Sequence, residues 1–472
     1  MMKTTRPLLT RLAPLVAALV LAGCAGLQTV EPVAAPAAPA AFKELDGRWT
    51  QTQPAEAQAR GEWWKTFGDP VLDELVVRAD RNSTSVQLAA ARLNQARALL
   101  RAADADRLPQ VAVGAGASRG NNATPGVTNP STLLSAGASV AWEADVFGRL
   151  AKASQAAALD AQASEALLQS TRLLVQSDVA RSYFALRALD SERALVRQTV
   201  EAYRDTLRLT ESRYKAGDVA ELDLARVQTE VAATQSQALA LDRQRAEVEH
   251  ALAVLLGELP SQFGLTALGD SAEWGGALPI VPPGVPSTVL TRRPDVAAAQ
   301  SSMLAAQKRV GVAQAAWFPD LSLTANGGFA SSDLGDLFKW SARSWGIGAL
   351  LSLPVFDGGR REAGVKGANA QWDAAAAGYR EQVLVAFRDV EDQLSALRLL
   401  ADQAGAQKQA VDAASRATVL STSRYRNGYV SQLELLDARR SELANRRQAL
   451  QVRAAQYQAT VGLIRALGGG WG

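Results

Sequence analysis

Two kinds of hydrophobic pattern divide the chain. Apolar side chains alternate with small or polar ones in residues 111–117, 134–146, 321–325 and 345–355, which predicts four strands with one apolar face. After residues 148 and 359, apolar positions recur every three or four residues, the spacing of a coiled-coil helix. No proline occurs in 131–259 or after Pro354, so these helices are predicted to be long. The chain is therefore predicted to be mostly α with four strands.

The order of these elements occurs twice. The segment Ser423–Asp437 has a near-copy that begins at Ser212, and Arg213 and Gly217 correspond to Arg424 and Gly428, 211 positions later. In each copy a long amphipathic run breaks at the Gly and then resumes, as in two helices joined by a Gly-capped turn. Each stretch is predicted to be the tip of a helical hairpin within an internal two-fold sequence repeat.

Shorter helices are predicted before each strand pair. Asp69 can cap a helix that has Pro70 in its first turn and continues to about Arg107. Its counterpart in the second half runs from residue 291 to Trp317. Gly-Arg pairs at 148–149 and 359–360 precede the two long helices.

The four predicted strands need further strands to pair with in a membrane. Four strands with one apolar and one polar face cannot sit alone in a bilayer, because each unpaired edge group there costs several kcal/mol. Closure takes at least about eight strands, so three copies would complete a twelve-stranded β-barrel with a polar lining. The helices, each roughly 100 Å long at ~1.5 Å per residue, would continue this cylinder. The sequence predicts a trimeric pore with a helical tunnel, and a soluble coiled coil with β-decorated loops is the alternative.

The first residues have the pattern of a secretory signal. A basic start is followed by an apolar run of about ten residues, which is too short to span a bilayer alone. The run ends Leu21-Ala-Gly-Cys24, which resembles the bacterial lipoprotein box, and Cys24 is the only cysteine, so no disulfide is expected. Lipidation of Cys24 by a diacylglycerol and an N-acyl chain is favoured over a buried thiol.

The domain organisation follows from these features. We assign residues 1–23 to the signal peptide, 24–60 to a lipidated Pro/Ala-rich tether, 61–260 to the first structural repeat, 261–290 to a linker and 291–472 to the second repeat. The net charge is +3, and Lys3, Arg6 and Arg11 all lie in the signal. Without them the chain has no net charge, so no nucleic-acid partner is predicted.

Catalytic and metal-binding patterns are absent or out of context. Gly116-Ala-Ser-Arg-Gly120 matches the Gly-x-Ser-x-Gly nucleophile elbow, but a loop rich in Asn, Pro and Gly follows it. His250 is the only histidine, is predicted on a helix surface and cannot form a zinc site with one cysteine. Trp63 and Trp64 are interpreted as core residues, and three further tryptophans as interface anchors: Trp142, Trp340 and Trp345.

Six motifs occur in a characteristic set: Glu62-Trp-Trp-Lys-Thr-Phe-Gly-Asp-Pro, Arg293-Pro-Asp-Val-Ala-Ala-Ala, Phe318-Pro-Asp-Leu-Ser-Leu, Arg213-Tyr-Lys-Ala-Gly, Arg424-Tyr-Arg-Asn-Gly and Leu435-Leu-Asp-Ala. They resemble the outer membrane factor family, the TolC-like channel-tunnels. More narrowly, the chain resembles the NodT-type lipoprotein branch of resistance-nodulation-division (RND) efflux systems. The resemblance covers nearly the whole mature chain.

This resemblance implies a homotrimer with a barrel in the outer membrane lipid and a periplasmic α-barrel. A periplasmic adaptor (membrane fusion protein) would join it to an inner-membrane RND pump. The implied function is passive conduction of small molecules to the exterior, without catalysis or a cofactor other than the lipid. Ala25, rather than Asp, follows Cys24, which implies the outer membrane. The alternatives are an exit duct of a type I protein secretion system and a periplasm-spanning scaffold or adhesin.

The resemblance also implies a gate. In the family, acidic side chains just past the Tyr-x-x-Gly turn ring the closed periplasmic end, and Glu434 and Asp437 match them here. Three Asp437 carboxylates would repel by ~1 kcal/mol per pair at ~4 Å in water and by ~4 kcal/mol at an effective dielectric of about 20. Simple solvation of a surface Asp is the alternative. Asp437 corresponds to Arg226 in the first copy, so the second hairpin is predicted to be the inner, gating one.

Further tip residues have implied roles. Tyr425 is expected to be a hydrogen-bonding latch, whereas Val430 stands where TolC carries an Arg, which leaves that protein's ion-pair latch without its cation here. Adaptor docking is expected at the hairpin tips, at Gly217, Gly428, Arg213 and Arg424.

Overall fold

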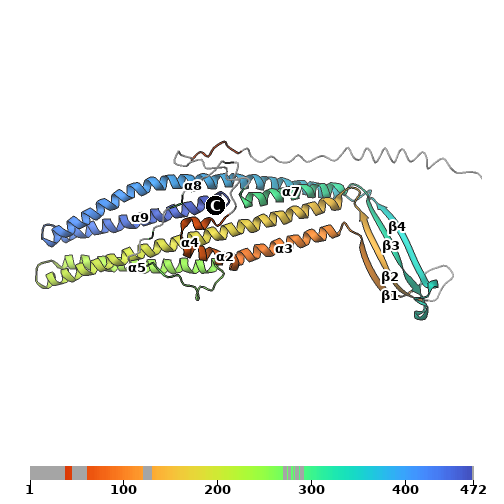
Figure 1. The fold of residues 1–472 in the computed structure, drawn as a ribbon, viewed down its shortest axis with the longest axis horizontal. Coiled ribbons are helices and arrows are strands. Elements are labelled where there is room, and N and C mark those ends of the chain that lie inside the picture. Colours follow the sequence, from red (N-terminus) through yellow and green to blue (C-terminus); the bar gives the residue numbers. More distant parts are fainter. Residues whose placement is uncertain are drawn as a thin grey trace, which may run out of the picture. The chain divides into compact units, whose positions relative to one another are not determined.

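A computed structural model describes residues 38–44, 61–120, 130–268, 274, 278–279, 281, 286 and 292–469 (Figure 1). The predicted signal peptide, Cys24, most of the tether and much of the 261–290 linker lie outside the described residues. Within the described part, the chain is mostly helical and has one four-stranded antiparallel sheet, as predicted. None of the described helices has a stretch that is both long and apolar enough to cross a membrane.

The two halves contain equivalent elements. The first half has η3 (Trp63–Phe67), α2 (Pro70–Asn82), α3 (Thr84–Ala105), β1 (Gln110–Gly120), β2 (Ser131–Ala144), α4 (Arg149–Lys215) and α5 (Glu221–Leu255). The second has α7 (Pro294–Ala315), β3 (Asp320–Ser331), η4 (Leu334–Asp336), η5 (Trp340–Ala342), β4 (Arg343–Ser352), α8 (Arg360–Arg426) and α9 (Gln432–Ala466). Helices α4 and α8 each have 67 residues, and α5 and α9 each have 35, so the predicted duplication is also a structural one.

Local signals set most helix ends. Asp69 caps α2 through hydrogen bonds from the amides of Val71 and Leu72, at 3.0 and 3.3 Å. The predicted continuous helix to Arg107 is in fact two helices, because Ser83 leaves the helical conformation with ψ 125°. Asn, Ser and Thr around this break are weak formers of helix interiors, since their side chains compete for backbone hydrogen bonds.

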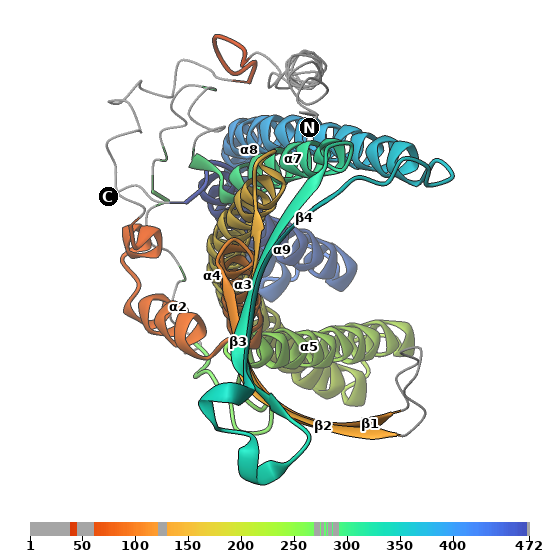
Figure 2. The same ribbon diagram turned by 90° about the vertical axis from the view of Figure 1, so that its right-hand side faces the viewer.

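The sheet has the order β1-β2-β3-β4, so β1 and β4 are its edge strands (Figure 2). The register aligns Val111 with Val140, Val140 with Ala325, and Ala325 with Ile347, which places the predicted apolar positions on one face. That face is uncovered in the single chain: Val113 is 85% exposed and Ile347 82%. β1 and β3 extend beyond the predicted alternation at both ends, and β2 begins earlier than predicted. β4 ends at Ser352, before Pro354, which cannot donate a ladder hydrogen bond.

The other face of the sheet carries small residues. Gly137 of β2 lies opposite Gly328 of β3, and a Cβ on Gly137 would come within 2.7 Å of the Gly327 carbonyl oxygen. Within the four described strands, the charged side chains of this face are Glu143 and Asp320, both at the end nearest the helices. Between that end and the loops, the face consists mainly of Gly, Ser, Thr, Ala and Asn.

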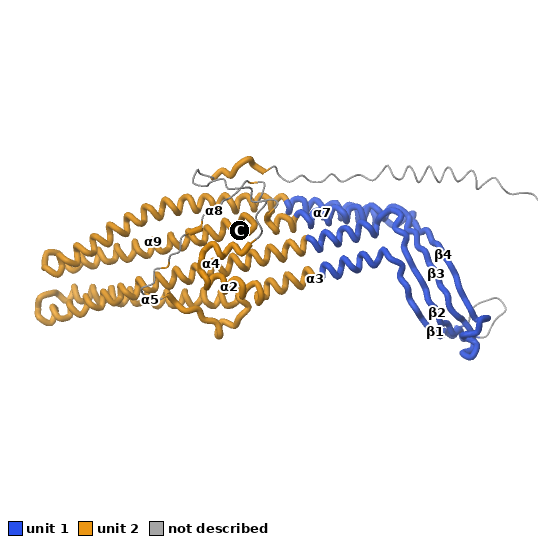
Figure 3. Tube along the Cα trace, viewed as in Figure 1, with its two compact units in different colours: residues 1–35, 95–162, 300–379 blue, residues 36–94, 163–299, 380–472 orange. Residues whose placement is uncertain are grey.

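The chain forms two compact units (Figure 3). Among the described residues, those within 95–162 and 300–379 form one unit, which includes the sheet. Those within 38–94, 163–299 and 380–469 form the other, which includes the ends of both hairpins. An aromatic core lies in the second unit, where Phe184 and Trp274 each lie 4.7 Å from Tyr457 between ring centroids. Trp63 and Trp64 are 1% and 5% exposed, so their interpretation as core residues is correct.

Candidate functional site

The two hairpin tips share one turn geometry. Gly217 and Gly428 have φ of 83° and 79°, a left-handed conformation that favours glycine. The amide of Asp218 donates to the carbonyl of Arg213, and the amide of Tyr429 to that of Arg424, both at 2.9 Å. These are the long bonds of the Schellman motif, which ends α4 and α8. The return helices α5 and α9 begin after the N-cap residues Ala220 and Ser431. The predicted docking residues therefore lie at or beside the turns.

The first tip lies against the second. Tyr425 is only 6% exposed, and the Cζ atom of Arg213 lies 5.2 Å from the centroid of its ring. This distance is that of a cation–π contact. The hydroxyl of Tyr425 is buried and has no hydrogen-bond partner among the described residues. The structure thus brings together two predicted residues that are 212 positions apart, through the ring rather than through the hydroxyl.

A polar seam continues this contact along α9. Gln432 Nε2 donates to Thr210 Oγ1 of α4 at 2.9 Å, and both residues are buried. Arg439 Nη1 donates to the carbonyl of Ala202 at 3.0 Å and to Thr206 Oγ1 at 2.6 Å. Burial lowers the pKa of Arg439, and both of these acceptors are neutral oxygens. The seam therefore holds α9 to α4 with hydrogen bonds whose loss would leave buried polar groups unpaired.

An ion pair and an apolar cluster complete the seam. Arg440 forms a short ion pair with Glu230 of α5. Tyr203, Val227 and Leu436 pack together beneath it, each at most 1% exposed. Burial, together with the nearby charge of Glu230, raises the pKa of Tyr203 to about 12, so this side chain is neutral at physiological pH. The three helices α4, α5 and α9 therefore meet in one closely packed seam.

The sequence pattern did not reveal the polar residues of the seam: Gln432, Arg439, Arg440, Glu230 and Thr210. One signal could have found the arginines. Arg439 and Arg440 occupy the positions of Gln228 and Thr229 in the first copy, so the charge there belongs to the second hairpin alone.

The predicted acidic residues lie outside the seam. Glu434 and Asp437 are both exposed on α9 in the single chain. A guanidinium nitrogen of Arg424 lies 4.0 Å from a carboxylate oxygen of Glu434, a loose pair between half-exposed side chains. Asp437 is therefore accessible to water and to other copies of the chain.

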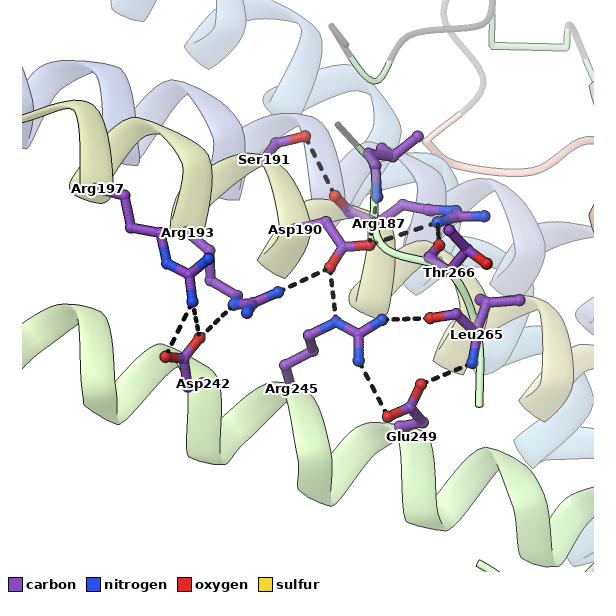
Figure 4. Close-up of polar contacts among 11 residues, drawn as sticks. Arg187, Asp190, Ser191, Arg193, Arg197, Asp242, Arg245, Glu249, Leu265 and Thr266 are labelled. Atoms are coloured by element: carbon purple, nitrogen blue, oxygen red, sulfur yellow. Dashed lines mark hydrogen bonds and ion pairs between the residues drawn. The ribbon is translucent and has the colours of Figure 1, made fainter. Parts of the chain in front are cut away.

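A buried charge cluster fixes the first hairpin closer to its base (Figure 4). The Asp190 side chain is fully buried and accepts hydrogen bonds from Arg245 at 2.7 Å and from Arg187 and Arg193 at 3.4 Å. Arg245 also donates to the carbonyl of Leu265 at 2.6 Å, and the Leu265 amide donates to Glu249 at 2.7 Å. The cluster ties α4, α5 and the segment after α5 together.

The described residues give no support for a metal site or for the nucleophile-elbow pattern. The described residues include no group of three or more His, Cys, Asp or Glu that could hold a metal ion. His250 is exposed on α5, as predicted for a helix-surface residue. Ser118 lies within β1 rather than at a strand-to-helix turn, so the nucleophile-elbow pattern has the wrong context.

An amphipathic four-stranded sheet, with each strand pair followed by a long helical hairpin, defines one protomer of a TolC-like channel-tunnel. The chain matches the model of the outer membrane efflux protein family over residues 75–258 and 285–469, and it belongs to that family. The predicted family, fold class and outer-membrane location are thereby confirmed. The family is one of efflux channels rather than enzymes.

Individual relatives of this chain are also outer-membrane proteins of export and efflux systems. The pyoverdine export outer membrane protein OpmQ of Pseudomonas aeruginosa is 35% identical over 420 residues, 87% of each chain. The solvent efflux pump outer membrane protein SrpC of Pseudomonas putida is 32% identical over 471 residues, 97% of this chain and 98% of SrpC. These relatives favour efflux over the alternative of protein secretion.

Solved structures share the fold. The outer-membrane channel OprN is 31% identical, covers 94% of this chain and 99% of its own, and superposes with a TM-score of 0.86. The open state of the Neisseria gonorrhoeae MtrE outer membrane channel is 26% identical, covers 94% and 98%, and has a TM-score of 0.80.

Proposed function

We propose that three copies of this chain form the outer-membrane channel of a tripartite RND-type efflux system. The channel would conduct small molecules passively from an inner-membrane pump and a periplasmic adaptor to the exterior, without catalysis. One observation carries the proposal: the sheet has two free edges and an uncovered apolar face, with Val113 85% and Ile347 82% exposed. In a bilayer such edges must be paired, and three copies would pair them in a closed barrel.

The gate is assigned to the second hairpin tip. Glu434 and Asp437 are exposed on α9, where copies related by a three-fold axis would bring their carboxylates together. Tyr425 would hold the second tip against the first through the ring contact with Arg213. Adaptor docking is assigned to the turns at Gly217 and Gly428 with Arg213 and Arg424, whose backbone geometry is the same in both repeats.

The N-terminus is assigned a lipid anchor at Cys24, a diacylglycerol and an N-acyl chain, with no other cofactor. A contact farther along the chain supports a bound N-terminal segment. The amides of Lys43 and Glu44 donate to the two carboxylate oxygens of Glu391 on α8, at 2.8 and 2.9 Å. The tether, residues 24–60, would include this contact.

Reconstitution tests the duct. The detergent-extracted protein should run as a trimer and produce single-channel conductance in planar lipid bilayers. A well-folded trimer with no pore activity would contradict the channel function and support a structural scaffold instead. Co-purification with a co-expressed adaptor and pump, and mass analysis of the N-terminal peptide for acyl chains, test the partners and the anchor separately.

A further inference from the structure

The loop end of β4 combines an arginine with exposed aromatic rings. Arg343 is the first residue of β4, and its Cζ atom lies 4.5 Å from the centroid of the Trp340 ring. Its Nη1 donates to the Trp340 carbonyl at 3.1 Å. Trp340 is 75% exposed and Trp345, two residues into the strand, is 73% exposed. The guanidinium thus lies over one exposed ring, and a second exposed ring belongs to the residue two positions further along the strand.

The strand register puts Arg343 on the apolar face. Arg343 pairs with Phe329, and Phe329 with Ala136, which belongs to the apolar set of β2. Alternation along β4 places Trp345 and Ile347 on the same face as Arg343. A cation on the lipid-facing side of a barrel destabilises it at the bilayer midplane and costs almost nothing at the interface. Exposed tryptophans mark that interface.

The carboxylates of the loop between β3 and β4 have other partners. Asp333 accepts a hydrogen bond from the amide of Gly335 at 2.9 Å, and Asp336 forms an ion pair with Lys339. Among the described residues, Arg343 has no carboxylate within ion-pair distance. Its remaining N–H donors are therefore available to an external anion, and a guanidinium presents them in the fork that suits phosphate oxygens.

We propose that Arg343, with Trp340 and Trp345, binds the phosphate of an anionic lipid headgroup at the loop end of the sheet. This rests on the proposed function, which places the apolar face in the outer membrane. Closure of the barrel would bring a further arginine to the site from a neighbouring copy. The edge strand β4 would then lie beside β1 of the next copy, whose apolar face carries Arg119 near its loop end. The site would thus combine the rings and arginine of one copy with an arginine of its neighbour.

Lipid binding to the intact trimer tests the proposal. The trimer is reconstituted in nanodiscs of phosphatidylcholine, alone or mixed with phosphatidylglycerol or with bis-phosphorylated lipid A, and retained lipid is counted by native mass spectrometry. Arg343→Gln should bind the phosphorylated anionic lipids roughly fivefold more weakly than the unaltered protein. Arg343→Lys should recover part of the affinity, because it restores the charge but not the planar fork. Lys339→Gln is the matched control, since that cation is already paired with Asp336.

Two results would contradict the lipid site, and separate measurements on the same variants test the proposed function. Equal retention of anionic lipid by Arg343→Gln and Lys339→Gln would overturn the proposal, as would equal retention of phosphatidylcholine and anionic lipids by the unaltered protein. Conductance and outer-membrane fractionation of the same variants keep the two proposals apart. A conducting trimer without lipid preference contradicts only the lipid site, whereas a protein absent from the outer membrane contradicts the proposed function. If Arg343→Gln does not form a trimer, anionic-lipid retention is compared between the unaltered protein, Arg343→Lys and Arg119→Gln, and equal retention by all three would overturn the proposal.

Discussion

The guanidinium of Arg213 lies over the ring of Tyr425, 5.2 Å from its centroid, and joins the tip of the first hairpin to the tip of the second. The ring is almost completely buried, while its hydroxyl has no partner among the described residues. The contact therefore depends on the ring face and the cation, and substitutions at the two positions can separate these contributions.

Tyr425→Ala should open the tip. Removal of a buried aromatic ring typically costs about 3–5 kcal/mol, and here the ring lies between the hairpins. We expect higher basal conductance in planar bilayers and greater uptake of large antibiotics by cells. Tyr425→Phe, which keeps the ring, should stay close to the unaltered channel, and a leak as large as that of the Ala variant would argue for the hydroxyl instead.

Asp437→Ala should also raise basal conductance, by removing the charge from the proposed ring and thereby lowering its selectivity for cations. Ion selectivity measured from reversal potentials in a salt gradient is the direct readout. Asp412→Ala, at an exposed carboxylate of α8, is the matched control. An unchanged leak and selectivity in Asp437→Ala would leave that carboxylate a solvated surface group.

The pair between Arg440 and Glu230 should contribute modestly to the seam. The Arg440 side chain is 51% exposed, so solvent screens the pair, and we expect a coupling of roughly 1 kcal/mol. A double-mutant cycle with Arg440→Gln and Glu230→Gln, read by thermal unfolding of the trimer, measures it. Coupling indistinguishable from zero would assign the seam to its hydrogen bonds and apolar cluster.

The stability of the trimer should fall in acid, partly through Asp295. Burial alone would raise the pKa of this carboxyl, but the hydrogen bond and charge of Arg293, 2.6 Å away, outweigh it and lower the pKa below its usual value. The stabilisation is thus fully present above the unfolded pKa of about 3.9 and is lost as the pH falls through the lower folded pKa. Asp295→Asn should cost roughly 1–3 kcal/mol at neutral pH. Unfolding temperatures of the variant and the unaltered protein should run parallel from pH 7 to about pH 4 and converge at lower pH, and a difference that persists undiminished down to about pH 2 would contradict the assignment.

Asp69 should be worth more than an ordinary helix cap. Besides capping α2, it accepts a hydrogen bond from the hydroxyl of Tyr183, and burial, followed by this bond, raises the pKa of Tyr183 to about 12. Asp69→Ala should cost about 1 kcal/mol for the cap and about 1–3 kcal/mol for the stranded hydroxyl. Tyr183→Phe should remove only the second part, and equal losses in both variants would show that the cap contributes little.

Local chemistry explains what the sequence could predict. The turns at Gly217 and Gly428 need a left-handed φ, and the start of α2 needs an acceptor at Asp69, so a few neighbouring residues suffice for both. Alternation assigned the apolar face of the strands correctly, because side-chain direction in a strand depends only on position. The strand ends differ from those predicted, because they depend on the pairing partner as well as on alternation.

Long-range packing explains what could not be predicted. Gln432 and Thr210 are 222 residues apart, and neither has a neighbour in sequence that reveals the other. The break at Ser83 coincides with a close approach, since a Cβ on Gly257 would lie 2.3 Å from the Asn82 carbonyl oxygen. Such contacts exist only once the two segments have packed.

The facing glycines of the sheet have a consequence for export. At Gly137 and Gly328 the polar face is bare backbone, and the rest of it consists mainly of small residues, with Leu133 and Leu350 as its large apolar side chains. Such a wall has few charged or large side chains with which to bind or repel a passing molecule. We therefore expect the barrel wall to contribute little to discrimination among cargoes, and the proposed gate and the pump to contribute most of it.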